Sequence, residues 1–422
     1  MRRRVVSTVK RWAWGLIGTL GLALAVPGLV GAQYVCTFPD GGTPTAVLNT
    51  YYPGTGNPAA GQNYINLTYG SPRGAANAIQ AGDLLLIIQM QGVDITTTNS
   101  SAYGGNNGTG AGYTNDANFV AGRYEYVVAD AGNNQAYGTC TAANNKICIT
   151  GGGTGNGLIN AYRTNASGAQ GRDTFQVIRV AQYGTLTLSG TAGVVTPLAL
   201  PWDGTTGGVL AVDVSGTATV SGTISLDGLG FRGGGARALA GSGTAQTTDY
   251  RRVSTVAAHG AKGEGIAGTP AYVYDGTAVV ATGSEGWTTG SQARGAPANA
   301  GGGGTDGNPS ANDQNSGGGG GGNGGAGGRG GNTWSGNAAL GGLGGVGLPA
   351  AANRIFMGGG AVPEAATTRS IRRAAAAAVA GSCSCARGAS PGPARSRRTA
   401  RPLPRLTTTV AAAAARAGPS SS

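Results

Sequence analysis

The 422-residue chain contains 83 glycines, 23 of them in residues 301–350, and a single histidine. Its formal charge of +12 resides at the two ends, because residues 33–360 hold 14 basic and 16 acidic residues. The near-neutral body excludes an electrostatic surface for nucleic acid or anionic membranes. The composition is typical of an exported structural or surface protein, and it excludes an enzyme with a recognisable active site.

The first 32 residues have the pattern of a signal peptide. Five basic residues among the first eleven precede an apolar stretch that runs to about Val30. Small residues at Gly31 and Ala32 fit a cleavage site, which predicts Gln33 as the first mature residue. A membrane anchor is the alternative, because the stretch is about long enough to span a bilayer. Pro27 favours cleavage, so we expect no transmembrane segment in the mature chain.

Residues 33–200 are predicted to form an all-β domain. Short runs rich in Val, Ile, Thr and Tyr are separated by Gly, Asn and Ser turns, and no long helical period competes with them. We expect strands in five runs of this part of the chain, at residues 81–90, 122–130, 145–152, 174–180 and 183–190. About 170 residues are enough for the domain to bury its own core.

Three cysteines lie in this predicted domain. Cys140 and Cys148 flank a turn-forming Ala-Asn-Asn-Lys segment, so an exported protein would use them as a disulfide that pins a hairpin. Two unpaired thiols are the alternative. Cys36 then has no partner in this part of the chain, and it is either a free thiol or a link to another chain.

Residues 201–300 are predicted to form β-solenoid-like coils with loops. GTLTLSGTAG (residues 184–193) and GTATVSGTISLDG (residues 216–228) are near-repeats that alternate apolar and small polar residues and then turn on glycine. Short, similar, glycine-punctuated strands are typical of stacked coils. An antiparallel meander would give a similar pattern, so it remains an alternative.

Residues 301–360 form a glycine-rich low-complexity segment. Residues 321–332 read GGN-GGA-GGR-GGN, a strict period of three. That period matches the polyproline II helix, which has three residues per turn, and glycine on two of its three faces would let neighbouring helices approach closely. The pattern therefore predicts either a packed layer of such helices or a flexible glycine-rich loop.

Residues 361–422 change abruptly to Ala, Arg, Pro and Ser. Reading alanine codons one base out of phase gives glycine, and the same shift turns residues 381–393 into IVFVRAGSISGT and residues 407–418 into a glycine-rich tract. We therefore expect a one-base slip near residues 357–360, a disordered tail, and a longer natural chain. On this interpretation Cys383 and Cys385 have no evolved role. A genuine cationic disordered tail is the alternative.

Few residues can support chemistry. His259 lies in a glycine-rich run, and we expect it to be an exposed loop residue rather than part of a catalytic triad. Asp203, Asp213 and Asp227 lie in the predicted coils, where paired carboxylates would suit glycosidic cleavage. Solvated turns are the preferred interpretation of these carboxylates, so we predict no catalytic residue.

One group of oxygen-bearing residues is a weak calcium candidate. Carboxylate and amide oxygens are the ligands that Ca²⁺ prefers, and four of them cluster in the GGGGTDGNPSANDQN segment. The segment lacks a regular calcium-binding repeat, so turns are the preferred interpretation and no other cofactor is expected. The four residues are Asp306, Asn308, Asn312 and Asp313.

Several segments resemble a group of large secreted glycine-rich bacterial proteins. They are PWDGTTGGVLAV (residues 201–212), GTISLDGLGFRGGG (residues 222–235) and RIFMGGG (residues 354–360). The resemblance implies a structural protein that continues into extracellular repeat domains. It implies no catalytic residues.

These observations lead to one expectation of function, with two alternatives. We expect a secreted or cell-surface, non-enzymatic structural or adhesive protein, all-β, whose partners are cell-envelope polymers or glycans. A carbohydrate-active β-solenoid enzyme is the first alternative. A passive glycan- or ice-binding module is the second.

Overall fold

The computed structural model describes most of one compact unit, residues 37–422. The described residues are 46–130, 140–166, 168–195, 198–235, 249–255, 258–287, 290–305, 315–333, 336–349, 351–362, 382–387 and 407–410. Their regular elements are β-strands and two single-turn 3₁₀ helices, η1 (Ala142–Asn144) and η2 (Thr154–Asn156), with no α-helix among them. The all-β prediction is therefore confirmed. The predicted signal peptide and Cys36 lie outside the described residues.

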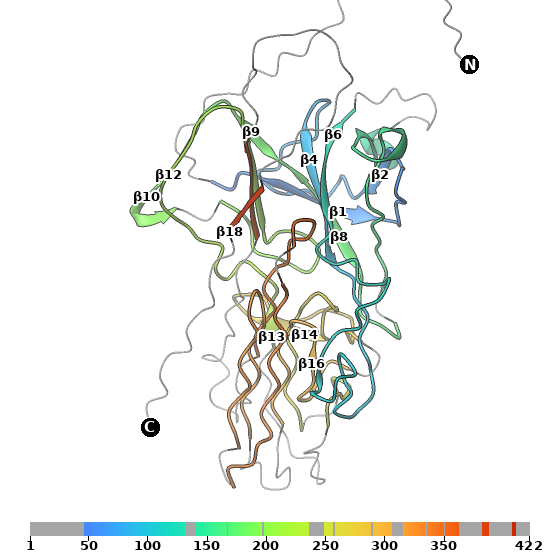
Figure 1. The fold of residues 1–422 in the computed structure, drawn as a ribbon, viewed down its shortest axis with the longest axis vertical. Coiled ribbons are helices and arrows are strands. Elements are labelled where there is room, and N and C mark those ends of the chain that lie inside the picture. Colours follow the sequence, from blue (N-terminus) through green and yellow to red (C-terminus); the bar gives the residue numbers. More distant parts are fainter. Residues whose placement is uncertain are drawn as a thin grey trace, which may run out of the picture. The chain divides into compact units, whose positions relative to one another are not determined.

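Six antiparallel strands close into a barrel (Figure 1). Each strand pairs with the next in the order β1, β2, β7, β6, β4, β8, and β8 pairs back onto β1. The short β3 (Arg73–Gly74) also pairs with β1. The barrel strands are β1 (Thr50–Thr55), β2 (Tyr64–Leu67), β4 (Leu84–Gln91), β6 (Tyr124–Ala129), β7 (Lys146–Thr150) and β8 (Thr174–Arg179).

The environment of strand β4 explains why its sequence is a nearly continuous apolar run. All eight of its residues are buried. Successive side chains of a strand point to opposite faces. Leu85 and Ile87 pack in a cluster with Tyr52 and Phe175, while Leu86 and Ile88 pack in a separate cluster with Trp202 and Met357. The strand is therefore covered on both faces: by the barrel interior and by the chain that follows the barrel.

The second region pairs strands in parallel. β9 (Ala181–Tyr183) and β17 (Ser382–Arg387) flank β11 (Val209–Val214), and β10 (Leu186–Val195) pairs with β12 (Ala218–Ile224). β18 (Thr407–Val410) adds to β17 in the antiparallel sense. Leu188, Leu210 and Val212 belong to one apolar cluster beneath these strands. Only β10 and β12 fall on the predicted near-repeats, and these short pairings do not amount to a demonstrated solenoid.

Two small sheets lie further along the chain. β13 (Gly233–Gly234), β14 (Tyr272–Tyr274) and β15 (Val279–Ala281) form an antiparallel sheet. β5 (Ala111–Gly112) pairs in parallel with β16 (Ala296–Pro297), which joins a loop of the barrel region to the glycine-rich region.

Six segments without strand geometry form what we call the glycine bundle. They are residues 259–264, 298–304, 316–322, 327–333, 340–346 and 357–362. In Figure 1 its later segments are the neighbouring orange traces. Each segment is hydrogen-bonded to others through backbone groups, and sequence neighbours run antiparallel. This result favours the packed arrangement over the flexible loop for the described residues.

The hydrogen bonds of the bundle recur every three residues, the period of polyproline II helices. Residues 316–322 donate to 327–333, which donate to 340–346, which donate back to 316–322. The donor–acceptor pairs are Gly317 N–Gly331 O (3.1 Å), Gly320 N–Gly328 O (2.8 Å), Gly327 N–Gly345 O (2.8 Å), Gly330 N–Gly342 O (2.8 Å), Gly342 N–Gly317 O (2.9 Å) and Gly345 N–Gly320 O (2.9 Å). The period seen in the sequence is therefore the period of the backbone contacts.

The bundle and the barrel share one core. Ile88 and Met90 of β4 belong to the same buried cluster as Ala298 and Leu348 of the glycine-rich chain. The chain just before the last bundle segment also bonds to the loop before β6, since Ile355 N donates to Gly122 O at 2.8 Å. The barrel thus supplies the apolar surface that the bundle, which has few large side chains, lacks.

Candidate functional site

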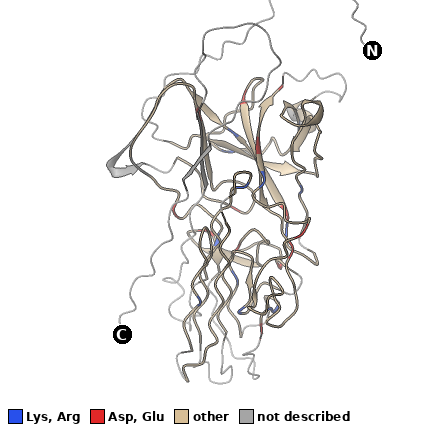
Figure 2. Cartoon of the chain, viewed as in Figure 1, with Lys and Arg blue, Asp and Glu red and all other residues tan. Residues whose placement is uncertain are grey.

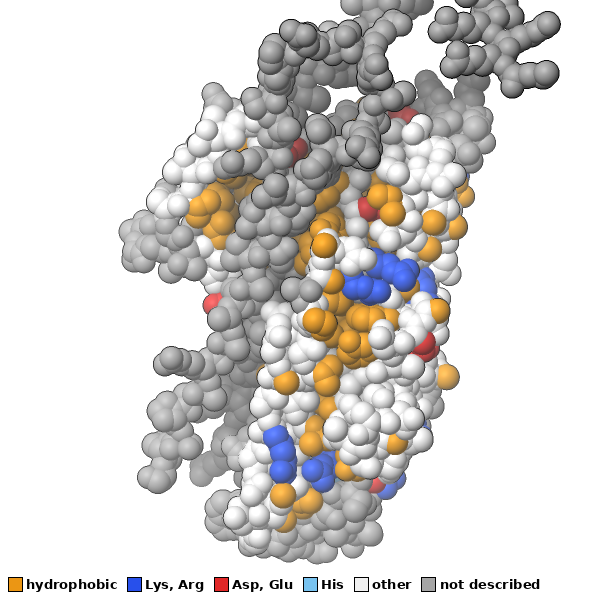
Figure 3. All heavy atoms as spheres, viewed as in Figure 1, with side chains coloured by type: hydrophobic (Ala, Val, Ile, Leu, Met, Phe, Trp, Pro, Cys, Tyr) orange, Lys and Arg blue, Asp and Glu red, His pale blue; other side chains and the backbone are white. Residues whose placement is uncertain are grey.

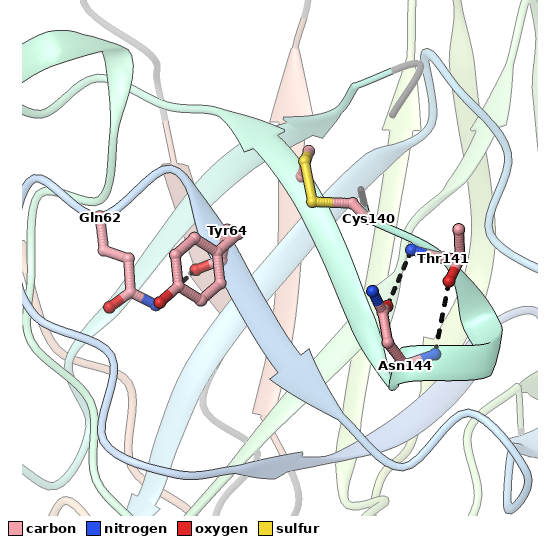
Figure 4. Close-up of a disulfide and its surroundings, with 6 residues drawn as sticks. Gln62, Tyr64, Cys140, Thr141 and Asn144 are labelled. Atoms are coloured by element: carbon pink, nitrogen blue, oxygen red, sulfur yellow. Dashed lines mark hydrogen bonds between the residues drawn. A yellow bond between two sulfur atoms is a disulfide. The ribbon is translucent and has the colours of Figure 1, made fainter. Parts of the chain in front are cut away.

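The predicted disulfide is present. Cys140 and Cys148 are bonded, with their Cα atoms 5.5 Å apart. The loop between them is held by η1, in which Thr141 N donates to Asn144 Oδ1 at 2.9 Å (Figure 4). The expectation of a pinned hairpin needs correction, because Cys148 lies in β7 while Cys140 lies in the connection before it. The bond therefore ties a loop to the barrel wall.

The three candidate aspartates are held by different partners. Asp203 caps its own turn, with Oδ1 accepting from Thr205 and Thr206, and its Oδ2 lies 3.0 Å from Arg73. Asp213 accepts from Gln182 at 3.1 Å. Asp227 is exposed in a turn, and its backbone N–H donates to Ser225. None of the three accepts from the same group as another, so these contacts do not bring the carboxylates into a shared site.

The weak calcium candidate lies outside the described residues, because residues 306–314 are not described. Within the part of the chain that the structure describes, no group of three or more His, Cys, Asp and Glu side chains could hold a metal ion.

The prediction that His259 is exposed is wrong. Its side chain is fully buried, and its Nε2 lies 3.3 Å from Asp249 Oδ2. Asp249 also accepts from Arg252 and Asn99, each at 2.7 Å. Burial opposes ionisation of this carboxyl, but these bonds outweigh burial and lower its pKa. The glycines on either side suggested a loop, yet close packing of the bundle covers the ring.

Lys262 is a buried cation that sequence reasoning missed. Its ammonium donates to three backbone carbonyl oxygens, of Tyr250 (2.6 Å), Ala293 (2.9 Å) and Gly295 (2.5 Å). It also lies 4.6 Å from the centre of the Tyr103 ring. Carbonyl and ring faces are both attractive to a cation. The available signal was the sequence GAKGEG, in which two charges stand alone among small residues.

Glu264 is the second buried charge of that motif. Its carboxylate accepts from Arg232 Nε at 2.8 Å, from Arg232 Nη2 at 3.0 Å and from Thr269 Oγ1 at 2.6 Å. Burial raises the pKa of this carboxyl, but the charge and hydrogen bonds of Arg232 outweigh it and the pKa is lowered. The pair joins the bundle to the turn that follows β12, so its role is structural.

The glycine bundle itself is the feature with the strictest geometry. A Cβ placed on Gly319 would collide with the carbonyl oxygen of Leu343, and one on Gly330 with that of Gly317. By contrast, Gly328 and Gly331 have no neighbour within 4 Å of such a Cβ. The prediction of two contact faces per triplet therefore holds for one face only in residues 327–331. The other face is exposed.

Charged groups are sparse and of both signs along the chain (Figure 2). On the face drawn in Figure 3, basic side chains form small separate groups, and acidic ones are scattered. Such a distribution offers no continuous stripe for a phosphate backbone on that face.

Comparisons with known proteins give no relative. Among the described residues, no helix is both long and apolar enough to cross a membrane. No protein-family model, no curated protein and no solved structure matches this chain.

Proposed function

We propose that the chain is an exported, non-enzymatic structural protein of the bacterial cell surface or extracellular matrix. In this proposal the barrel and the glycine bundle together form a stiff scaffold or adhesive stalk. The observation that carries it is the closed set of backbone hydrogen bonds in residues 316–322, 327–333 and 340–346. A network of this kind uses no side-chain chemistry, which suits a mechanical role better than a catalytic one.

The parallel pairings support a finer proposal for residues 181–224. β10 and β12 lie on the two near-repeats and pair in parallel, and the strands that precede them, β9 and β11, pair in the same parallel sense. We infer that they are successive coils of a β-solenoid, as expected of units that bury a face only against a neighbour.

The tail extends this inference. β17 pairs in parallel with β11, residue by residue from Val209 with Ser382 to Val214 with Arg387. In the shifted reading frame the same stretch reads IVFVRAG, an apolar β run like the VLAVDVSG of residues 209–216. We therefore retain the proposal of a one-base slip and a longer natural chain. Sequencing the gene through the codons for residues 354–370 tests it, and confirmation of the frame as given would overturn it.

Cell fractionation tests the main proposal. The intact chain is expressed in a bacterial host and probed in cytoplasmic, surface and medium fractions, with a variant lacking residues 1–32 as the matched control. We expect surface-bound, protease-accessible protein for the intact chain alone. Recovery of the full-length product only as a free protein in the medium would overturn the surface role.

The enzymatic alternative has its own test. A broad panel of polysaccharides is incubated with the purified chain and with Asp213→Asn and Asp227→Asn. We expect no cleavage by any of them. Cleavage by the parent chain that either variant abolishes would replace the structural proposal with the enzymatic one.

A further inference from the structure

Two adjoining hollows open between the start of β8 and the loops beside it. One, of about 320 Å³, is lined in part by Arg172, Glu285 and Trp287. The other, of about 280 Å³, is lined in part by Arg172 and Asp173. Ala166 and Arg172 line both, so the hollows are neighbours that share one wall.

Arg172 is the charged group of this wall that lacks a partner. It forms no ion pair or hydrogen bond with any residue that the structure describes. The carboxylates whose charge it feels are Glu264 and Asp203, and these are paired with Arg232 and Arg73. The guanidinium is half-buried and stays charged, because arginine is not deprotonated in proteins.

The acidic residues in the hollows are already engaged. Asp173 lies 3.1 Å from Arg163 and accepts from Asn165 at 2.7 Å. Glu285 accepts from the backbone N–H and the hydroxyl of Ser254. Neither carboxylate forms an ion pair or hydrogen bond with Arg172, although Glu285 lines the same hollow and has no cationic partner among the described residues. An anion supplied from outside would therefore be the first group to bond the guanidinium directly.

Trp287 carries a buried donor in the wall of the first hollow. Its indole ring is 1 % exposed, and its Nε1–H has no hydrogen-bond acceptor among the described residues. Buried donors of this kind are nearly always satisfied. Trp287 lines the same hollow as Arg172, and its buried Nε1–H lies beside the backbone of Gly171.

We propose that the double hollow binds a carboxylate-bearing sugar chain, with the Arg172 guanidinium forming a bidentate pair with a uronate carboxylate. Planar guanidinium and carboxylate groups match in geometry, and such charge-assisted bonds are stronger than neutral ones. The second hollow is lined in part by Thr55, Thr164, Asn165 and Thr205. The last three already donate to Gly56, Asp173 and Asp203, so their oxygens remain as acceptors for the hydroxyls of a neighbouring ring. Two small, open hollows in a row, lined by both apolar and polar groups, fit successive sugar rings, which have apolar faces and polar edges, better than a peptide side chain.

Calorimetric titration with tetragalacturonate tests this proposal. The parent chain, Arg172→Gln, Arg172→Lys and Arg329→Gln are compared, the last as a matched loss of one exposed guanidinium in the bundle. We expect binding by the parent and by Arg329→Gln, and at least about tenfold weaker binding by Arg172→Gln. The affinity of Arg172→Lys should lie between those of the parent and Arg172→Gln, because lysine keeps the positive charge but cannot make the bidentate contact of a guanidinium.

Three results would overturn the proposal. They are no binding by the parent chain at millimolar tetragalacturonate, equal binding of its methyl ester, and equal binding by Arg172→Gln. Tighter binding of an acidic peptide than of tetragalacturonate would assign the site to a different class of ligand. A thermal unfolding midpoint for Arg172→Gln equal to that of the parent separates loss of binding from loss of fold. None of these results bears on the proposed scaffold role, which rests on the glycine bundle.

Discussion

The barrel and the glycine bundle are held together by opposite means. Barrel strands are joined by side chains such as Ile87 and Phe175, which fill its interior. Bundle segments are joined by backbone groups, at distances that leave no room for a Cβ at Gly319 or Gly330. One region therefore depends on large residues, and the other depends on their absence. The barrel also supplies, through Ile88 and Met90, apolar surface that the bundle needs.

The largest expected effect is at the buried pair that ties the bundle to the neighbouring chain. Glu264→Gln leaves the Arg232 guanidinium buried without its counter-charge, which typically costs about 3–5 kcal/mol of unfolding free energy. Chemical denaturation with circular dichroism measures it. Arg329→Gln, which removes an exposed charge, is the control and should change little. An equal loss of unfolding free energy in both variants would mean that the buried Arg232–Glu264 pair is no more important for stability than an exposed charge.

The same residue gives a pH dependence with a definite sign. The pKa of Glu264 is lowered in the folded state, so its contribution is complete above the ordinary Glu pKa of about 4.3 and is lost as pH falls through the folded value. Unfolding free energy should therefore fall on acidification below about pH 4. This part of the pH dependence should be missing from Glu264→Gln. A parallel profile in the variant would contradict the assignment.

A substitution in the barrel interior should have the next largest effect. Ile87→Ala removes a fully buried side chain from β4 and leaves a cavity, so we expect a loss of about 3 kcal/mol. Val128→Ala, on an exposed position of β6, is the matched control and should lie within about 0.5 kcal/mol of the parent. Denaturant titration of both variants measures the difference. A small effect at Ile87 would show that the barrel interior is not the main source of stability.

Loss of the disulfide should cost somewhat less. A short loop closed by Cys140 and Cys148 constrains the unfolded chain by about 2–3 kcal/mol in the chain-entropy description. The double variant Cys140→Ala with Cys148→Ala should therefore unfold at a lower temperature. Differential scanning calorimetry checks it, and adding a reductant to the parent should reproduce the shift. An unchanged unfolding temperature in both experiments would mean that the disulfide does not stabilise the fold.

Adjacent glycines give the sharpest test of the comparison. Gly330→Ala places a methyl group against a carbonyl oxygen, so a loss of about 1–3 kcal/mol is expected. Gly331→Ala meets no atom within 4 Å and should be neutral or stabilising by up to about 1 kcal/mol, because the unfolded chain loses freedom. Thermal unfolding of the pair decides whether backbone contact matters. Equal effects would mean that these glycines serve flexibility alone.

Local patterns determined much of the barrel and part of the bundle. The apolar run of residues 81–90 has the length of a strand buried on both faces, and β4 is buried throughout. The alternation of residues 122–130 predicted a strand because side chains alternate between faces, and burial in β6 largely follows that period. The spacing of Cys140 and Cys148 predicted their disulfide because a turn-forming segment between them brings the two residues close together. The triplet period of residues 321–332 equals the turn of the polyproline II helix and so indicated a packed layer of such helices, with a flexible loop as the alternative. The backbone hydrogen bonds at every third residue decide for packing in the described segments.

Tertiary structure alone decided which residues share an environment. His259 and Lys262 lie among glycines, a pattern typical of exposed loops, yet both are fully buried because distant segments pack over them. The bundle begins at residue 259, well before the glycine-rich tract, because its partners are set by hydrogen bonds between segments far apart in the chain. Barrel closure and the unpaired Arg172 likewise depend on contacts between distant segments. No local pattern encodes such contacts, because their free energy exists only after the chain has folded.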